Sequence, residues 1–262
     1  MTNTFRRSLL LALDAQGYGS KEDWLQRSIQ KAILEHLEGA AEDAGLSTGR
    51  WEIQKGGDGL LAVLPPDTPE EKVLDPLVRS FARRLREHNR ERNAESALRM
   101  RAALHVGPAT PAANGYSGDG PVRVGRLLDS PPLRRALAAT SGSLAVAVSE
   151  PLYRDVIVAA GCTQWTAEDF RQVAVHVKET REPAWLCTPL VGDIHSLDLG
   201  DPPAPGDAPG DAPAPGGVRA AVQGSGSAAA PAQEGHAASP VINTQMNGGV
   251  VIHGPVNFGI SK

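Results

Sequence analysis

The sequence of 262 residues has few cysteines, few aromatic residues and no long apolar run. Its two cysteines, Cys162 and Cys187, are too few for a disulfide framework and lie in no metal-binding spacing, which favours a reducing, cytoplasmic setting. Asp14 ends the apolar run 9–13 before it reaches the length of a signal-peptide core. No segment approaches the roughly 20 apolar residues needed to cross a bilayer, so we expect neither secretion nor membrane insertion.

A large excess of one charge sign is also lacking. The formal net charge is −4 and the sequence pI is about 6.0, which gives no general attraction to nucleic acids or anionic membranes. The arginines of 79–92 are not interleaved with aromatic residues, so this segment is expected to be a solvated helix face. We therefore expect neither nucleic acid nor membrane as a partner.

Composition divides the chain into three parts. Residues 5–191 are numerous and apolar enough for one globular domain. Residues 192–240 are dominated by Pro, Ala, Gly and Asp, which cannot bury enough apolar surface to offset the conformational entropy of folding. They are predicted to form a disordered, semi-extended linker. Residues 241–262 are again rich in β-branched and amide side chains and are predicted to be a short β-prone tail.

Hydrophobic periodicity predicts alternating strands and helices in the first part. The expected strands cover 8–14, 50–54, 59–64, 99–106, 144–148, 172–177 and 184–190. The expected helices cover 21–44, 69–92 and 121–138, the last interrupted at Pro131-Pro132, and 107–120 is expected to be a loop. This order predicts an α+β fold with helices on one face of a sheet.

Two aspartates stand at turns of the predicted fold. Asp14 closes the first strand, directly before the turn-forming residues 16–19, and Asp58 lies in the hairpin connection 55–58. Taken singly, either aspartate is typical of an ordinary turn or helix cap. Together they are a candidate pair of carboxylate ligands for a divalent metal ion.

The residues around these aspartates resemble motifs of the class III adenylate/guanylate cyclases. Asp14-Ala-Gln-Gly-Tyr is similar to the first metal motif of that family, Asp-x-x-Gly-Phe/Tyr, and Gly57-Asp58-Gly-Leu-Leu-Ala-Val is similar to the second. Arg101-Ala-Ala-Leu-His105-Val-Gly is similar to the strand Arg-x-Gly-Ile-His-x-Gly. Further similarities, at 118–127 and 148–178, follow in the order of the family.

The resemblance extends over residues 8–190 and indicates a divergent, actinobacterial-like member. It implies a ferredoxin-like βαββαβ cyclase-homology domain with extra C-terminal strands, followed by the linker and the tail. It also implies synthesis of a cyclic nucleotide from a nucleoside triphosphate, in bacterial signalling or defence. His105, which alternates with apolar residues, is expected to be structural.

The resemblance assigns roles to particular residues. Asp14 and Asp58 would hold Mg²⁺ or Mn²⁺, and a pair of such ions can stabilise the attacking and the leaving oxygen. Arg126 would oppose the charge on the transferred phosphate. The family forms a head-to-tail homodimer, so Arg126 would act on the aspartates of the other subunit. The substrate-binding positions would be Ala15, Gln16, Gly17 and Tyr18, which cradle phosphates, and Gln54 and Lys55 near the base.

The sequence departs from the family at two positions. Val122 stands where the family has a ribose-orienting Asn, and Gln54 stands where it has a base-reading Lys, with Lys55 one position away. A shift of one residue would instead place Arg123 at the Asn and Leu127 at the Arg. The alternative function is therefore a catalytically inactive cyclase-like binding or regulatory module.

The tail resembles the short amyloid-type signalling motifs of bacterial effectors. Residues 241–260 combine β-branched residues with Asn, Gln and Gly, which can stack in register between chains. The resemblance implies a sensor protein with a matching motif as a partner. Pro255 opposes an uninterrupted ladder, and a tail without function is the alternative.

Overall fold

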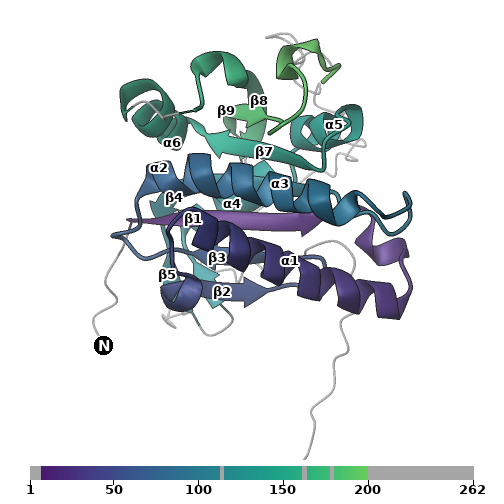
Figure 1. Cartoon of the computed structure of the whole chain (residues 1–262). Helices are drawn as coiled ribbons and strands as arrows, with labels where there is room; N and C mark the ends of the chain where they lie inside the picture. Colours follow the sequence, from purple (N-terminus) through teal and green to yellow (C-terminus); the bar gives the residue numbers. More distant parts are fainter. Residues whose placement is uncertain (1–6, 113–114, 161–163, 178–179, 200–262) are drawn as a thin grey trace, which may run out of the picture. The chain divides into compact units, whose positions relative to one another are not determined.

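The computed structural model describes residues 7–112, 115–160, 164–177 and 180–199 (Figure 1). Residues 200–262, which include most of the predicted linker and the whole tail, lie outside this range, as does Cys162. The larger of two sheets has seven strands in the order β2-β3-β1-β4-β7-β9-β8. These strands are β1 (Arg7–Ala15), β2 (Glu52–Lys55), β3 (Gly59–Val63), β4 (Met100–Pro108), β7 (Leu144–Ser149), β8 (Arg171–Val177) and β9 (Thr180–Cys187).

Strands β2, β3, β1 and β4, in this order across the sheet, form the predicted ferredoxin-like core. β1 lies between β3 and β4 and is antiparallel to both, while α1 (Asp23–Asp43) connects β1 to β2. β4 pairs in parallel with β7, and β8 and β9 extend the sheet beyond it. The α+β fold with extra C-terminal strands is therefore confirmed.

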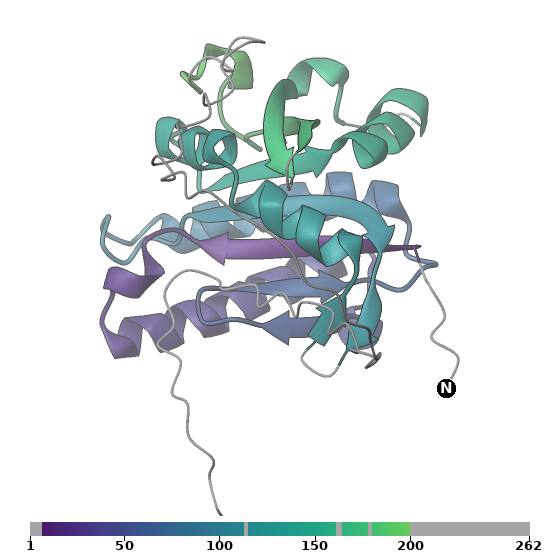
Figure 2. The ribbon, with the colours of Figure 1, turned by 180° about the vertical axis from the view of Figure 1, so that it is seen from behind.

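Helices cover both faces of the sheet, so the expectation that they lie on one face is wrong. Leu9, Leu11 and Leu13 of β1 pack in one cluster with α1 and α3 (Val78–Asn89). Leu10 and Ala12 pack in a second cluster with α4 (Asp119–Leu128) and α5 (Pro131–Ala139). Figures 1 and 2 show these two layers from opposite sides. Because both faces are buried, residues 9–13 of β1 form a continuous apolar run rather than an alternating pattern.

The helix expected at 69–92 has an irregular turn near its start. α2 (Glu70–Lys72) runs into a wider, π-type turn at Val73–Leu77 and then into α3. The turn contains Pro76, which has no N–H to donate and whose ring clashes with the preceding turn.

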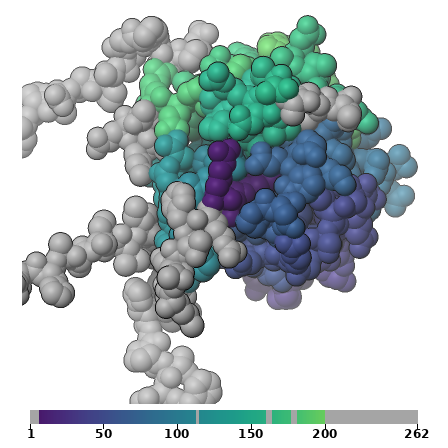
Figure 3. Space-filling model, turned by 90° about the vertical axis from the view of Figure 1, so that its left-hand side faces the viewer, coloured from purple at the N-terminus to yellow at the C-terminus, as the bar shows by residue number. Residues whose placement is uncertain are grey.

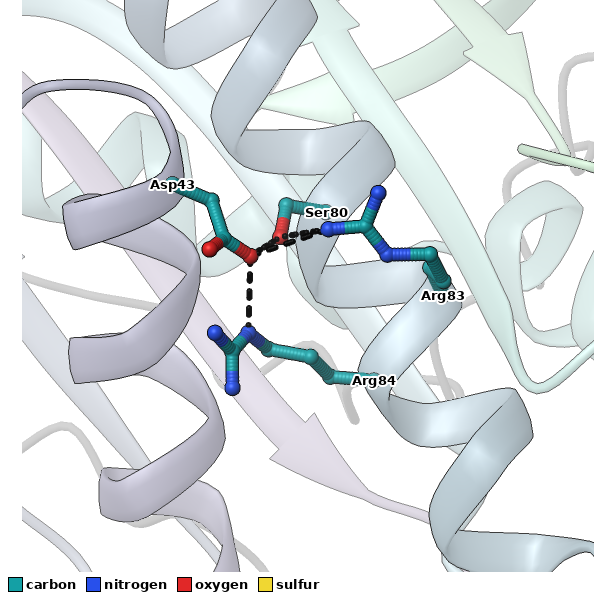
Figure 4. A network of polar contacts seen from close by, with 4 residues as sticks. All are labelled: Asp43, Ser80, Arg83 and Arg84. Carbon is teal, nitrogen blue, oxygen red and sulfur yellow. Dashed lines mark hydrogen bonds and ion pairs between the residues drawn. The ribbon is translucent and has the colours of Figure 1, made fainter.

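A carboxylate at the end of α1 joins α1 to α3 (Figure 4). Oδ2 of Asp43 accepts hydrogen bonds from Arg84 Nε at 3.0 Å, from Arg83 at 3.0 Å and from the Ser80 hydroxyl. The bonds from Arg84 and Ser80 lower the pKa of Asp43 to about 2. The Arg84 guanidinium lies against Gly39, where a β-carbon would collide with it.

Other segments differ from the sequence-based expectation. The expected loop 107–120 contains a hairpin of β5 (Thr110–Ala112) and β6 (Gly115–Ser117). α6 (Glu150–Leu152) and a further helical segment, Tyr153–Ala160, follow β7 and had no counterpart in the expectation. The last strand, expected at 184–190, is β9 at Thr180–Cys187.

The two ends of the described domain differ in how they contact the rest of it. Residues 192–199, assigned by composition to the linker, contain a short helical turn, and Ile194 and Leu199 are buried in the second cluster, so the folded part extends to Leu199. The purple N-terminal end of β1 reaches the surface beside the later green elements (Figure 3). There Arg7 forms an exposed ion pair with Asp155 at 3.3 Å. No helix among the described residues is long and apolar enough to span a membrane.

Candidate functional site

Asp14 and Asp58 lie side by side at one end of the sheet. Asp14 is opposite Gly59 in the antiparallel pair of β1 and β3, and Asp58 directly precedes Gly59. The N–H of Ala15 donates to the carbonyl oxygen of Asp58 at 2.8 Å, which ties the hairpin to the end of β1. The carboxyl group of Asp58 is close enough to that of Asp14 to raise its pKa.

The carboxylate of Asp14 is buried and carries an ion pair. Asp14 is 6% exposed, and burial raises its pKa to about 6. The guanidinium of Arg101, which is opposite Asp14 on β4 and is ion-paired with it, counteracts this rise, whereas Asp58 adds to it. Arg101 also donates to the carbonyl oxygen of Leu128, at the end of α4, at 3.3 Å. The cyclase-like motif contains Arg101, but only the strand register reveals its contact with Asp14.

The loop after Asp14 is held by side chains of α1. Gln30 donates to the hydroxyl of Tyr18 at 2.6 Å and to the carbonyl oxygen of Gly57 at 3.0 Å. It therefore connects the two segments that carry the aspartates. Gln26 donates to the carbonyl oxygen of Lys21 at 2.9 Å in the same loop. No motif in the sequence points to Gln30, because its role depends on where the helix places it.

The predicted phosphate cradle is partly occupied by bonds within the domain. The N–H of Ala15 is bound to Asp58, and the N–H of Gln16 donates to the carbonyl oxygen of Arg99 at 2.8 Å. Gly17 has a φ of 70°, a left-handed conformation that glycine adopts without strain. The N–H groups of Ala15 and Gln16 are thus not free to bind a phosphate.

The remaining predicted residues lie on α4 and β2. Arg126 is exposed on α4, and no contact between it and Asp14 or Asp58 occurs within the described part of the chain. Val122 precedes it by one helical turn on the same side. On β2, Gln54 lies with its side-chain amide against Gly115 of the β5–β6 hairpin.

Lys55, the second predicted base-side residue, is exposed at the end of β2. The structure also distinguishes the two alignments of α4. Leu127 is only 5% exposed, and Arg123 is ion-paired within the domain to Asp119 and Glu182. The shifted alignment would thus place Leu127, a core residue, at the position of the family's Arg. This favours the other alignment, which places Arg126 there.

The aspartate pair could hold a divalent metal ion together with other ligands. No group of three or more His, Cys, Asp or Glu side chains that could hold a metal ion occurs among the described residues. Mg²⁺ is commonly bound by one or two carboxylates, with substrate phosphates and water completing the shell. Asp14 and Asp58 would supply two such carboxylates, and a cation nearby would favour the ionised form of Asp14, whose pKa is raised by burial.

The chain matches no protein-family model and no curated protein. Solved structures do resemble it. The guanylyl cyclase Cya2 aligns with 76% of this chain and 100% of its own at 16% identity and a TM-score of 0.51. An adenylate/guanylate cyclase/hydrolase from Silicibacter pomeroyi aligns with 71% of this chain and 98% of its own at 19% identity and a TM-score of 0.51. A bacterial light-regulated adenylyl cyclase aligns with 74% of this chain and 56% of its own at 11% identity and a TM-score of 0.52. The described domain therefore has the fold of adenylate and guanylate cyclase domains.

Proposed function

We propose that the domain converts a nucleoside triphosphate into a cyclic nucleotide and pyrophosphate. The observation that carries the proposal is the adjacency of the carboxyl groups of Asp14 and Asp58 at the end of β1. In this reaction the ribose 3′-oxygen forms a bond to the α-phosphorus, the bond from that phosphorus to the pyrophosphate oxygen breaks, and the 3′-hydroxyl loses its proton.

The residues of the site would have different roles according to their charge. Asp14 and Asp58 would hold Mg²⁺ or Mn²⁺, which supplies charge stabilisation at the attacking and leaving oxygens. Arg101, which is ion-paired with Asp14 and donates to the carbonyl oxygen of Leu128, would hold the Asp14 carboxylate in position. Gly17 and the residues after it would orient the phosphates through backbone N–H groups.

The site also needs a group to oppose the charge on the α-phosphate, and we assign this role to Arg126 of a second subunit. The exposed position of Arg126 and the lack of a contact with the aspartates among the described residues support a homodimer in which α4 of one copy faces Asp14 of the other. Activity would then rise with protein concentration, because it depends on association.

The second candidate is an inactive cyclase-like module that binds a nucleotide or a partner. Two observations favour it: Val122 offers no hydrogen bond to a ribose, and Gln54, which is exposed on β2 with its amide near Gly115, stands in place of a base-reading Lys. Under this hypothesis, Asp14 and Asp58 would bind a metal-nucleotide complex without turnover.

The test is incubation of the full-length protein with each of the four ribonucleoside triphosphates and Mn²⁺. We expect a cyclic nucleotide and pyrophosphate from at least one of them, and loss of both in Asp58→Ala. Asp67→Ala is the matched control, since Asp67 is 65% exposed and is paired with Arg50 outside the site. Metal-dependent nucleotide binding without product at any protein concentration would identify the inactive module.

The tail, residues 241–262, lies outside the described residues, and its role is a separate proposal. Assembly through this motif, with itself or with a sensor protein carrying a matching motif, would raise the local concentration of the attached domains. This would favour the proposed homodimer in a bacterial signalling or defence response.

A further inference from the structure

A pocket away from the aspartate pair, here named the His105 pocket, lies where α4 meets β4, β7 and β9. It has a volume of about 250 Å³, and its lining includes His105, Arg123, Leu127, Ser149, Glu182 and Pro183. None of Asp14, Asp58 and Arg101 contributes to it. The pocket is therefore separate from the candidate metal site.

Three buried polar atoms in this lining lack a partner among the described residues. They are both ring nitrogens of His105 and the hydroxyl oxygen of Ser149. His105 is 4% exposed and Ser149 is 6% exposed. Buried polar side chains are nearly always hydrogen-bonded, so these atoms call for partners that the described residues do not supply, either water or a bound small molecule.

The charges at the pocket argue against an anion. The guanidinium of Arg123 is ion-paired with Asp119 and Glu182, and Glu150, which also lines the pocket, accepts a hydrogen bond from the indole of Trp185 at 2.5 Å. Within the described lining, no cation is left to attract a phosphate or a carboxylate.

His105 itself is neutral at physiological pH. Burial, with a smaller effect from Arg123, lowers its pKa to about 4, while Asp119 opposes this shift and Arg7 adds to it. A neutral imidazole has one N–H donor and one nitrogen acceptor, and the hydroxyl of Ser149 can donate and accept. The polar part of the pocket thus suits an uncharged group that combines a donor with an acceptor.

The shape of the pocket restricts the ligand further. Leu127, Pro151 and Pro183 supply apolar walls, and an apolar cavity of about 150 Å³ is known to hold a benzene ring. Apolar walls with a few convergent polar groups are typical of small-molecule sites. We propose that the His105 pocket binds an uncharged heteroaromatic ring of one or two fused cycles, with its ring nitrogens hydrogen-bonded to His105 and Ser149.

The test is calorimetric titration of the full-length protein with benzimidazole, which has one ring N–H and one acceptor nitrogen. Indole, of similar shape but without the acceptor, is expected to bind several-fold more weakly. Ser149→Ala is expected to raise the Kd for benzimidazole about 3–10-fold through the loss of one hydrogen bond, and His105→Phe to abolish binding. Ser130→Ala is the matched control, because the hydroxyl of Ser130 is also buried and unpartnered among the described residues but lies outside the pocket lining.

Two outcomes would overturn the proposal. If benzimidazole does not bind at ~10 mM, the pocket holds only water, and if Ser149→Ala binds as tightly as the natural protein, the ligand binds elsewhere. Ser149→Ala gives this answer even if His105→Phe fails to fold. The titration is repeated with Asp58→Ala, which should leave the Kd unchanged, so the result is independent of the proposed cyclase activity.

Discussion

Replacing Asp14 by Asn should stabilise the fold in the absence of metal while removing metal binding. The carboxylate is buried next to Asp58, and its pKa is raised from 3.8 to about 6 in the folded state. A raised pKa means that the folded protein holds this proton more tightly than the unfolded chain. The contribution of Asp14 to stability is therefore most favourable below pH 3.8 and is lost as the pH rises through about 6.

The size of this effect follows from the shift of about two pKa units. At about 1.4 kcal/mol per unit, ionised Asp14 reduces the free energy of unfolding by up to ~3 kcal/mol above pH 6. Asn has nearly the same shape and no charge, although it leaves Arg101 without its ion pair, so we expect a gain of about 1–3 kcal/mol at pH 7.5. For a domain of this size, 1 kcal/mol corresponds to about 2–4 °C in Tm.

The assay is thermal unfolding of both proteins in a chelator at pH 4 and at pH 7.5. The Tm of Asp14→Asn relative to the natural protein should be higher at pH 7.5 than at pH 4, because carboxylates away from this pair are the same in both proteins. Mn²⁺ at pH 7.5 should then raise the Tm of the natural protein but not that of Asp14→Asn. A Tm difference that does not change with pH would refute the reasoning.

Further predictions concern the supports of the site and the tail. Gln30→Met should raise the Kd for Mn²⁺ about 2–10-fold by calorimetry, since it releases Gly57, and Arg27→Met on the same helix should not. Asp43→Asn should lower the free energy of unfolding by roughly 1 kcal/mol at pH 7 in urea, a value that allows for the one-third exposure of Asp43 to solvent. The pKa of Asp43 is depressed to about 2, so the stability difference between the two proteins should shrink as the pH falls from 3.8 towards 2. A peptide of residues 238–262 should bind thioflavin T and Val251→Asp should prevent it, and a peptide that stays monomeric would contradict assembly.

The parts of the fold that the sequence predicted depend on local patterns. β1 was expected because a short apolar run ends at Asp14, and the hairpin because glycines surround Asp58. The adjacency of the two carboxyl groups follows from these two elements once the strands pair. The number of covered faces was predicted wrongly, although the uninterrupted apolar run of β1 is itself typical of burial on both sides.

The parts that the sequence did not predict depend on tertiary contacts. The helical segment Tyr153–Ala160 contains Val156, Ile157 and Val158, and β-branched residues favour strands when considered locally. The contacts of Arg101 with Asp14 and of Gln30 with Gly57 join segments far apart in the chain. Neither contact leaves a periodicity or a spacing that the sequence alone would show.

The pairing of β1 with β3 makes the distance between the two carboxylates a property of the hydrophobic core. A slip of β3 by one residue would exchange the faces of Leu60 and Leu61, and both faces of the sheet are filled. The residues that keep Asp58 beside Asp14 are thus mostly leucines and alanines that never contact a ligand. Substitutions in the site can change its chemistry while the spacing of the carboxylates persists, whereas core substitutions far from any ligand can alter that spacing.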